Sequence, residues 1–156
     1  MGMARRRSFL TAQTWDFVSV HRYPAFPGSG GGDEIGEDKG RGTTRNMPLA
    51  AGADDDIICA AFDEALNEMC SRLQPSVLLL SAGFDAHRAD PLGGMVATER
   101  GFQRMTRSAV AAAEKWSGGR LLSFLEGGFD LEALARSARI HVEELAKSSV
   151  EFSRED

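Results

Sequence analysis

LLLSAGFDAHRADPLGG, residues 78–94, joins a leucine-rich apolar run to a cluster of polar side chains. An apolar run of this length, bounded by turn signals, predicts a strand buried on both faces. The run continues directly into Asp85, His87 and Asp90. Unpaired polar groups are costly to bury, and loops that follow strands often carry functional sites. We therefore expect these three side chains at the rim of a sheet rather than in its core.

The composition is that of one ordinary globular domain. The chain has 156 residues, of which 42% are hydrophobic and 26% charged, which is enough to build a single core. Its formal net charge of -5 argues against a broad nucleic-acid surface. Cys59 and Cys70 lie eleven residues apart in one predicted helix, too far to bond, so we interpret them as reduced thiols of a cytoplasmic protein.

Arg5, Arg6 and Arg7 resemble the basic part of a twin-arginine export signal. Such a signal requires an apolar segment next, but here Asp16 and His21 follow within a short distance. Export is therefore not expected. No uninterrupted apolar stretch is long enough to span a bilayer, so no membrane partner is expected either.

Strands and helices alternate along most of the chain. WDFVSVH predicts a strand at residues 15–21, and a loop rich in Gly and Pro follows over residues 22–53. Helical spacing begins at Asp54, a suitable N-cap, and Pro75 ends this helix. The remaining expected elements are a strand at 77–81, a helix at about 98–116, a strand at 120–126 and a helix from 131 to about 147.

This alternation predicts right-handed crossovers and a parallel sheet covered by helices on both faces. In such sheets, ligands bind beyond the carboxyl ends of the strands. Each expected strand ends in unusual residues: His21 and Phe26 after the first, Asp85 and His87 after the second, and Gly127-Gly128-Phe129 after the third. We therefore expect a functional site where these ends meet.

Each of these residues also has a purely structural interpretation. Asp85 could cap a turn. Asp85 and His87 could instead lie on one side of an extended segment and ligate a metal, although two ligands do not make a zinc site. His21 is expected to bond backbone, and His141, in the last helix, to face solvent. Gly127-Gly128 could form a tight turn or a weak phosphate site.

Four sequence motifs together resemble one known family. Four motifs match, in order and spacing, the C-terminal half of the zinc-dependent histone deacetylase, acetoin utilisation and acetylpolyamine amidohydrolase superfamily: SVHRYPAFPGSGGGDEIG, SAGFDAHRADPLGGM, a Thr separated by two residues from GF, and LEGGFDLEALA with the SA and His that follow it. The resemblance implies an α/β fold, a three-layer α/β/α arginase-like domain with a mostly parallel sheet and its N-terminal half missing. Residues 15–147 would form this part, with 1–14 a non-homologous or truncated segment and 148–156 a disordered tail.

The resemblance implies roles for individual residues. Asp85 matches a zinc-ligating aspartate, and Asp90 matches the second acid of a D-x4-D pattern. His87 matches a position that the family does not use for zinc, so the Asp-x-His ligand pair is dropped. Phe129 stands where most active members have a tyrosine whose hydroxyl donates to the developing oxyanion.

Other positions match the walls around the family's site. Phe26 matches an aromatic residue of the tunnel that holds the acyl-lysine chain, and Gly127 and Gly128 match glycines beside the tunnel floor. Ser19 and Val20 fall at a monovalent-cation site, which implies K⁺, and His21 follows them as a supporting residue.

The sequence also departs from the family. The family's Asp-x-His zinc element and adjacent pair of catalytic histidines lie upstream of the segment that begins at Trp15, and this chain has three histidines, none adjacent to another. A catalytic zinc ion normally needs three protein ligands. Replacing the tyrosine by Phe129 removes one oxyanion donor, which typically costs about 100- to 1,000-fold in rate.

These observations lead to two hypotheses. The chain is a Zn²⁺-dependent deacetylase-like protein, which hydrolyses acetyl-lysine, acetylpolyamine or a related amide to acetate and free amine, and it is incomplete or inactive alone. Alternatively, it is a non-catalytic remnant that acts as a binding or interaction module. Its partners would be an acetylated substrate and either a complementing N-terminal half or a second copy, because a lost half-sheet uncovers strand edges and apolar faces.

Overall fold

The computed structural model describes residues 15–151, so the basic cluster at residues 5–7 and the end of the predicted tail at 152–156 lie outside the described part. The chain alternates strands and helices, as expected. The elements in order are β1 (Phe17–Arg22), the 3-10 helix η1 (Asp38–Gly40), β2 (Thr44–Leu49), α2 (Asp55–Leu73), β3 (Leu78–Gly83), α3 (Glu99–Ser117), β4 (Leu121–Gly127) and α4 (Leu131–Glu151).

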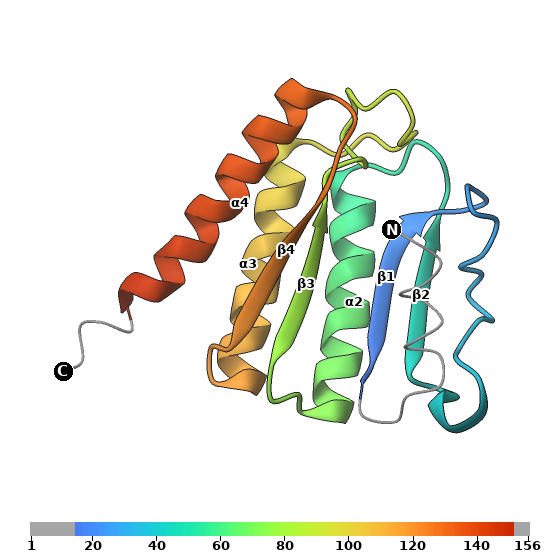
Figure 1. The fold of residues 1–156 in the computed structure, drawn as a ribbon, viewed down its shortest axis with the longest axis vertical. Helices are drawn as coiled ribbons and strands as arrows, with labels where there is room; N and C mark the ends of the chain where they lie inside the picture. The colour runs from blue at the N-terminus through green and yellow to red at the C-terminus, as the bar shows by residue number, and fades with distance from the viewer. Residues whose placement is uncertain (1–14, 152–156) are drawn as a thin grey trace.

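The strands form two parallel pairs rather than one continuous ladder. β1 pairs with β2, and β3 pairs with β4, in a register that places Leu79 opposite Leu122 and Ser81 opposite Phe124. The strands run side by side, and the loops that leave β3 and β4 lie together at the top in Figure 1, whereas the loop that leaves β1 runs down the right side. The predicted convergence is therefore present for the ends of β3 and β4, and Arg22 at the end of β1 lies against Gly94 beside them.

The prediction of an unstructured loop over residues 22–53 was wrong. β2 lies inside it and pairs along its whole length with β1, with Pro48 opposite His21. The segment TRNMPL gives little sequence signal, because it is short and its proline argues against a strand. Thr44 and Asn46 are buried, and the Asn46 amide bonds the carbonyls of Gly31 and Glu34, which ties the glycine-rich loop to the strand.

The helix ends follow the predicted capping chemistry. The Asp54 carboxylate accepts hydrogen bonds from the N–H groups of residues 56 and 57 at the start of α2. Gly118 ends α3 with φ of 57°, a conformation that glycine adopts without strain. Asp130 accepts a bond from Ala133 N at the start of α4. α4 continues through Glu151, four residues into the segment predicted as a tail.

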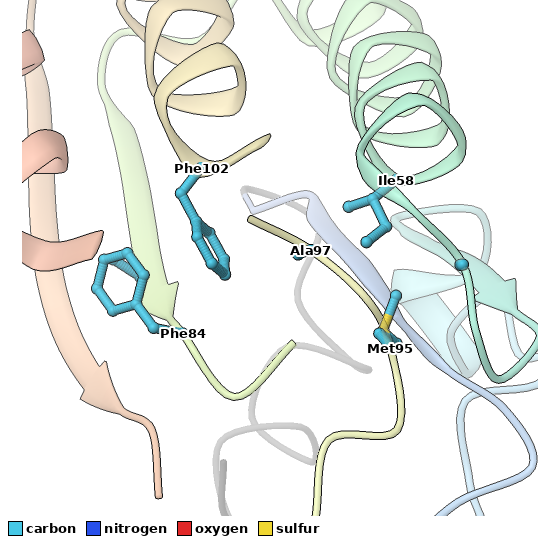
Figure 2. Packing of buried hydrophobic residues seen from close by; sticks show 7 residues of the cluster. Ile58, Phe84, Met95, Ala97 and Phe102 are labelled. Atoms are coloured by element: carbon cyan, nitrogen blue, oxygen red, sulfur yellow. The ribbon is translucent and has the colours of Figure 1, made fainter. Parts of the chain in front are cut away.

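The core lies where α2, α3 and the loop after β3 meet. Phe84 and Phe102 pack edge to face, with ring centroids 5.0 Å apart, and Figure 2 shows them beside Ala97, Met95 and Ile58. Cys59 and Cys70 are both buried and free on α2, as the spacing predicted. The loop that carries the candidate site is thus anchored by apolar packing on its inner side.

His141 does not face solvent, contrary to the expectation from its charged neighbours in sequence. It is 7% exposed on the inner side of α4. Its Nδ1 bonds the Thr106 hydroxyl on α3 and its Nε2 bonds the Ser123 hydroxyl on β4, each at 2.8 Å. Burial lowers the pKa of His141 below its ordinary value. This histidine therefore holds two helices and a strand together.

Helices cover only one face of β3 and β4 within the described residues, although the alternation predicted cover on both. The Ser123 side chain points toward α4, so its strand neighbours Leu122 and Phe124 point the opposite way. Leu79, which pairs with Leu122, lies on the same face, and these three side chains are 45–56% exposed. The uncovered apolar face is thus formed by Leu79, Leu122 and Phe124.

Candidate active site

Asp85 lies two residues beyond the end of β3, in a turn rather than on an extended segment. The preceding residue, Phe84, is buried and donates its N–H to the carbonyl of Gly127 at the end of β4. Glycines lie on both sides of the Asp85 backbone. A Cβ atom on Gly93 would overlap the Asp85 carbonyl oxygen, and one on Gly128 would lie 3.6 Å from the Asp85 nitrogen. The approach of Gly93 therefore requires that it has no side chain, whereas a Cβ atom on Gly128 would make only ordinary contact.

The Asp90 carboxylate connects two of these segments. One oxygen accepts the N–H groups of Leu92 and Gly93, each at 2.9 Å, and the other accepts the Phe129 N–H at 2.7 Å. Desolvation alone would raise the pKa of Asp90, but these backbone hydrogen bonds outweigh it and hold the pKa below its ordinary value. Asp90 is thus a buried, ionised carboxylate with several hydrogen-bond donors around it.

The pKa of Asp85 is shifted in the opposite direction to that of Asp90. Its side chain reaches solvent, yet the surrounding protein partly desolvates it and raises its pKa above the ordinary value. The nearby negative charge of Asp90 raises the pKa further. A cation placed beside Asp85 would stabilise its ionised form, because the positive charge offsets both the desolvation and the repulsion from Asp90.

His87 points away from Asp85 and into the core, where it is 2% exposed. Its Nδ1 accepts the Ala89 N–H at 3.1 Å, and its ring stacks on Phe102. Its Nε2 lies 3.5 Å from the Glu99 carboxylate, whose pKa is lowered to about 2, chiefly by a hydrogen bond from Arg136. The extended Asp85-x-His87 geometry considered from the sequence was wrong, and His87 is a core residue.

The aromatic residues expected around a substrate tunnel lie at the surface. Phe26 is 96% exposed in the loop after β1, and Phe129 is 64% exposed in the turn after β4. Gly127 and Gly128 form that turn, with φ of 138° at Gly127. These side chains form no closed tunnel in the described part of the chain, and their tunnel role stays a prediction.

The residues expected at a monovalent-cation site lie on β1. Ser19 and Val20 are half-buried, and the Ser19 hydroxyl bonds His21 Nδ1 at 2.8 Å. His21 Nε2 contacts the Gly30 carbonyl oxygen at 3.0 Å, in agreement with the expectation that it bonds backbone. His21 therefore anchors the glycine-rich loop that leads away from Phe26.

Two contacts at this end of the fold were not predicted. The sequence motif assigned no role to Gly93 or Gly94, yet Gly93 permits the close approach to Asp85. A Cβ atom on Gly94 would overlap the guanidinium of Arg22, so Gly94 brings the end of β1 against the Asp85 loop. The double glycine in DPLGG was the available signal, since adjacent glycines often mark a close backbone approach.

The residues described here do not make a complete zinc site. Among residues 15–151, no three His, Cys, Asp or Glu side chains are grouped to hold a metal ion. Asp85 supplies one oxygen donor, whereas a catalytic zinc site needs three protein ligands. No reaction step through a metal can therefore be derived from the described residues alone.

Comparison with known proteins identifies the family. The family model of the histone deacetylase domain matches residues 4–145. The chain belongs to the histone deacetylase family. It is 40% identical over 121 residues to histone deacetylase 10, chloroplastic, of Oryza sativa subsp. japonica, covering 78% of this chain and 27% of that protein. It is also 40% identical over 116 residues to a probable deacetylase of Archaeoglobus fulgidus, covering 74% of this chain and 32% of that protein.

Solved deacetylase structures confirm the fold. The crystal structure of the HDA15 HD domain superposes with a TM-score of 0.83 and 33% identity, covering 93% of this chain and 41% of that one. The histone deacetylase Clr3 superposes with the same TM-score at 28% identity, covering 25% of its chain. The chain thus has part of the α/β deacetylase fold, and it spans about a quarter to a third of the length of the curated relatives above.

Proposed function

We propose that this chain forms the carboxyl-terminal part of a zinc-dependent deacetylase site, which hydrolyses an acetylated lysine, polyamine or related amide to acetate and free amine. The observation that carries the proposal is the meeting of Asp85 with the Gly127–Phe129 turn at the strand ends, joined through Phe84 and Asp90. Family membership supports the same reaction class.

In this proposal Asp85 is one zinc ligand, and its raised pKa fits a carboxylate that is completed by a cation. Phe26 and Phe129 would flank the acyl chain, and Gly127 and Gly128 would line the floor. Ser19 and Val20 would hold K⁺. Zn²⁺ would polarise the amide carbonyl and bind the attacking water in a complete site. Its remaining ligands and the general base would have to come from residues outside the described part of this chain.

The aromatic ring at Phe129 can guide a substrate but cannot donate a hydrogen bond to an oxyanion. Its 64% exposure leaves room for a hydroxyl at the ring's para position without repacking the core. The proposed activity is therefore slow relative to a site with tyrosine here, by about 100- to 1,000-fold.

A chimera tests this proposal directly. The histone deacetylase-like amidohydrolase of Pseudomonas aeruginosa is 37% identical to this chain over 113 residues, which is 30% of its length. We replace that segment with the matching segment of this chain and assay hydrolysis of an acetyl-lysine peptide and an acetylpolyamine. We expect measurable hydrolysis, and we expect Asp85→Ala to abolish both the activity and zinc binding.

Two controls complete the test. The Phe129→Tyr chimera removes the expected rate penalty, and the parent amidohydrolase shows that the assay works. A chimera that folds and carries Phe129→Tyr but hydrolyses neither substrate would refute the proposal. For the chain alone, mass spectrometry after dialysis should give nearly zero zinc, and stoichiometric zinc with chelator-sensitive hydrolysis would contradict the incomplete site.

The uncovered apolar face favours a second candidate function, that of an interaction module. Contiguous exposed apolar residues on a strand pair mark a surface that associates, since burying apolar area is favourable. We assign it to the remainder of a deacetylase domain, because the relatives that superpose on this chain are much longer than it is. Light scattering after size exclusion distinguishes a monomer from self-association, and a monomer that binds no upstream deacetylase segment would contradict this assignment.

The cellular setting is a proposal of the same kind. Among the described residues, no helix is long and apolar enough to cross a membrane. Both Cys59 and Cys70 are free and buried, and burial raises the pKa of each thiol, which keeps it protonated and unreactive. Free thiols fit the proposal of a cytoplasmic protein. The rice relative and one from Arabidopsis thaliana are named chloroplastic, and fractionation of cells that express the tagged chain would decide between these locations.

A further inference from the structure

Asp90 stands out among the buried polar residues because its carboxylate bonds two separate chain segments next to the proposed site. It is 8% exposed. One oxygen accepts two N–H groups from the loop at Leu92 and Gly93, and the other accepts the Phe129 N–H from the turn before α4. Phe129 lies 39 residues after Asp90 in the sequence, with the whole of α3 and β4 between them.

Both bonded segments also pass close to the backbone of Asp85. A Cβ atom on Gly93 would overlap the Asp85 carbonyl oxygen, and one on Gly128 would lie 3.6 Å from the Asp85 nitrogen. The Phe84 N–H donates to the Gly127 carbonyl at 2.7 Å, so the residue before Asp85 is also bonded to the end of β4. A shift of either bonded segment would therefore change the backbone surroundings of Asp85.

We infer that Asp90 is a positioning residue that fixes Asp85 and Phe129 in one geometry. This inference rests on the proposed function, because it assigns those two residues to the site. A carboxylate suits this position because both of its oxygens accept hydrogen bonds. An asparagine of the same shape has one accepting oxygen, so its NH₂ group would face either the Phe129 N–H or the two loop N–H groups.

The test uses nuclear magnetic resonance on the full chain and needs no activity. In the unmutated protein we expect a scalar coupling across the hydrogen bond from the Phe129 nitrogen to the Asp90 carboxyl carbon. We also expect slow exchange of the Phe129 N–H and a nuclear Overhauser effect between Gly128 Hα and the Asp85 N–H. A missing coupling together with an unprotected Phe129 amide would overturn the inference without any variant.

Asp90→Asn supplies the second measurement. Exchange at Phe129, Leu92 and Gly93 should accelerate by about 10- to 100-fold beyond any change in global stability, because these hydrogen bonds to a charged acceptor are the ones lost. The Overhauser effect between Gly128 and Asp85 should weaken. The matched control is Asp54→Asn, since Asp54 also accepts two backbone N–H groups, but at the start of α2.

The outcomes separate three cases. Local acceleration in Asp90→Asn and none at these amides in Asp54→Asn supports the positioning role. Uniform acceleration of all amides shows a purely structural contribution and overturns it. Failure of the proposed function would appear instead as an inactive, zinc-free Phe129→Tyr chimera, with the hydrogen-bond measurements unchanged.

Discussion

Replacing His141 with phenylalanine should measurably destabilise the fold although His141 lies away from the candidate site. A phenyl ring is somewhat larger than imidazole, but it keeps an aromatic side chain beside Phe84, whose centroid is 5.9 Å away. The two hydrogen bonds to Thr106 and Ser123 would be lost. The substitution therefore removes both polar connections of the histidine while it keeps an aromatic ring at this position.

The structure sets the direction of each bond and the size of the loss. The Thr106 hydroxyl donates to the Phe102 carbonyl at 2.8 Å, so it accepts the Nδ1–H of His141, and Ser123 donates to Nε2. Thr106 keeps its bond to Phe102 in the variant, whereas Ser123 loses its partner. Two net hydrogen-bond contributions of about 0.5–1.5 kcal/mol each give an expected loss of about 1–3 kcal/mol.

Urea unfolding followed by circular dichroism measures this loss as a lower midpoint at unchanged slope. Adding Ser123→Ala to the variant should recover part of the stability, because it removes the unpaired hydroxyl. A midpoint shift that corresponds to less than about 0.5 kcal/mol would refute the reasoning, since that is the lower bound for one hydrogen bond.

The pH dependence provides an independent check on the same residue. Burial lowers the pKa of His141 from its ordinary value of 6.5, so the unfolded state binds the proton more readily than the folded state. The stability contributed by the neutral ring is complete above pH 6.5 and decreases as the pH falls below it. The difference in unfolding free energy between the native protein and His141→Phe should therefore shrink on acidification, and a constant difference would contradict this account.

Three further predictions follow from other contacts. The pKa of Glu144 is lowered to about 2, chiefly by a hydrogen bond from Arg107, so the stability it contributes should be lost as the pH falls from 4.5 toward 2. In Glu144→Gln the urea midpoint should therefore depend less on pH over that interval. Phe124→Ser on the uncovered apolar face should reduce self-association, or binding of an upstream deacetylase segment, as measured by light scattering. The control Ile57→Ser, at a residue 51% exposed on α2, should leave both unchanged. Phe129→Tyr in the chimera should raise kcat by about 100- to 1,000-fold, and an unchanged kcat would show that another donor serves the oxyanion.

Much of the fold was predictable because its signals are local. Helical spacing, the Asp54 cap, Pro75 after the first long helix and Gly118 after the second placed α2 and α3 within a residue or two. β2 was missed because a short strand with Pro48 is stabilised by pairing with β1, and no local pattern reports a pairing partner.

The candidate site was only partly predictable for the same reason. The sequence placed Asp85 at a strand end, since an apolar run followed by polar residues indicates where a strand leaves the core. It could not show that His87 turns inward while Asp85 faces out, because a turn, unlike a strand, has no fixed alternation of side chains. It also gave no sign that Asp90 bonds Phe129, since that contact spans α3 and β4.

The sequence by itself determined the order of most strands and helices, their caps and the position of the polar cluster, because each depends on neighbouring residues. The tertiary structure alone decided that His141 is buried, that Asp90 joins two distant segments and that one face of β3 and β4 is uncovered within the described residues. Burial and pairing depend on which surfaces meet in space, and the free energy of a polar side chain depends on the partners it finds there.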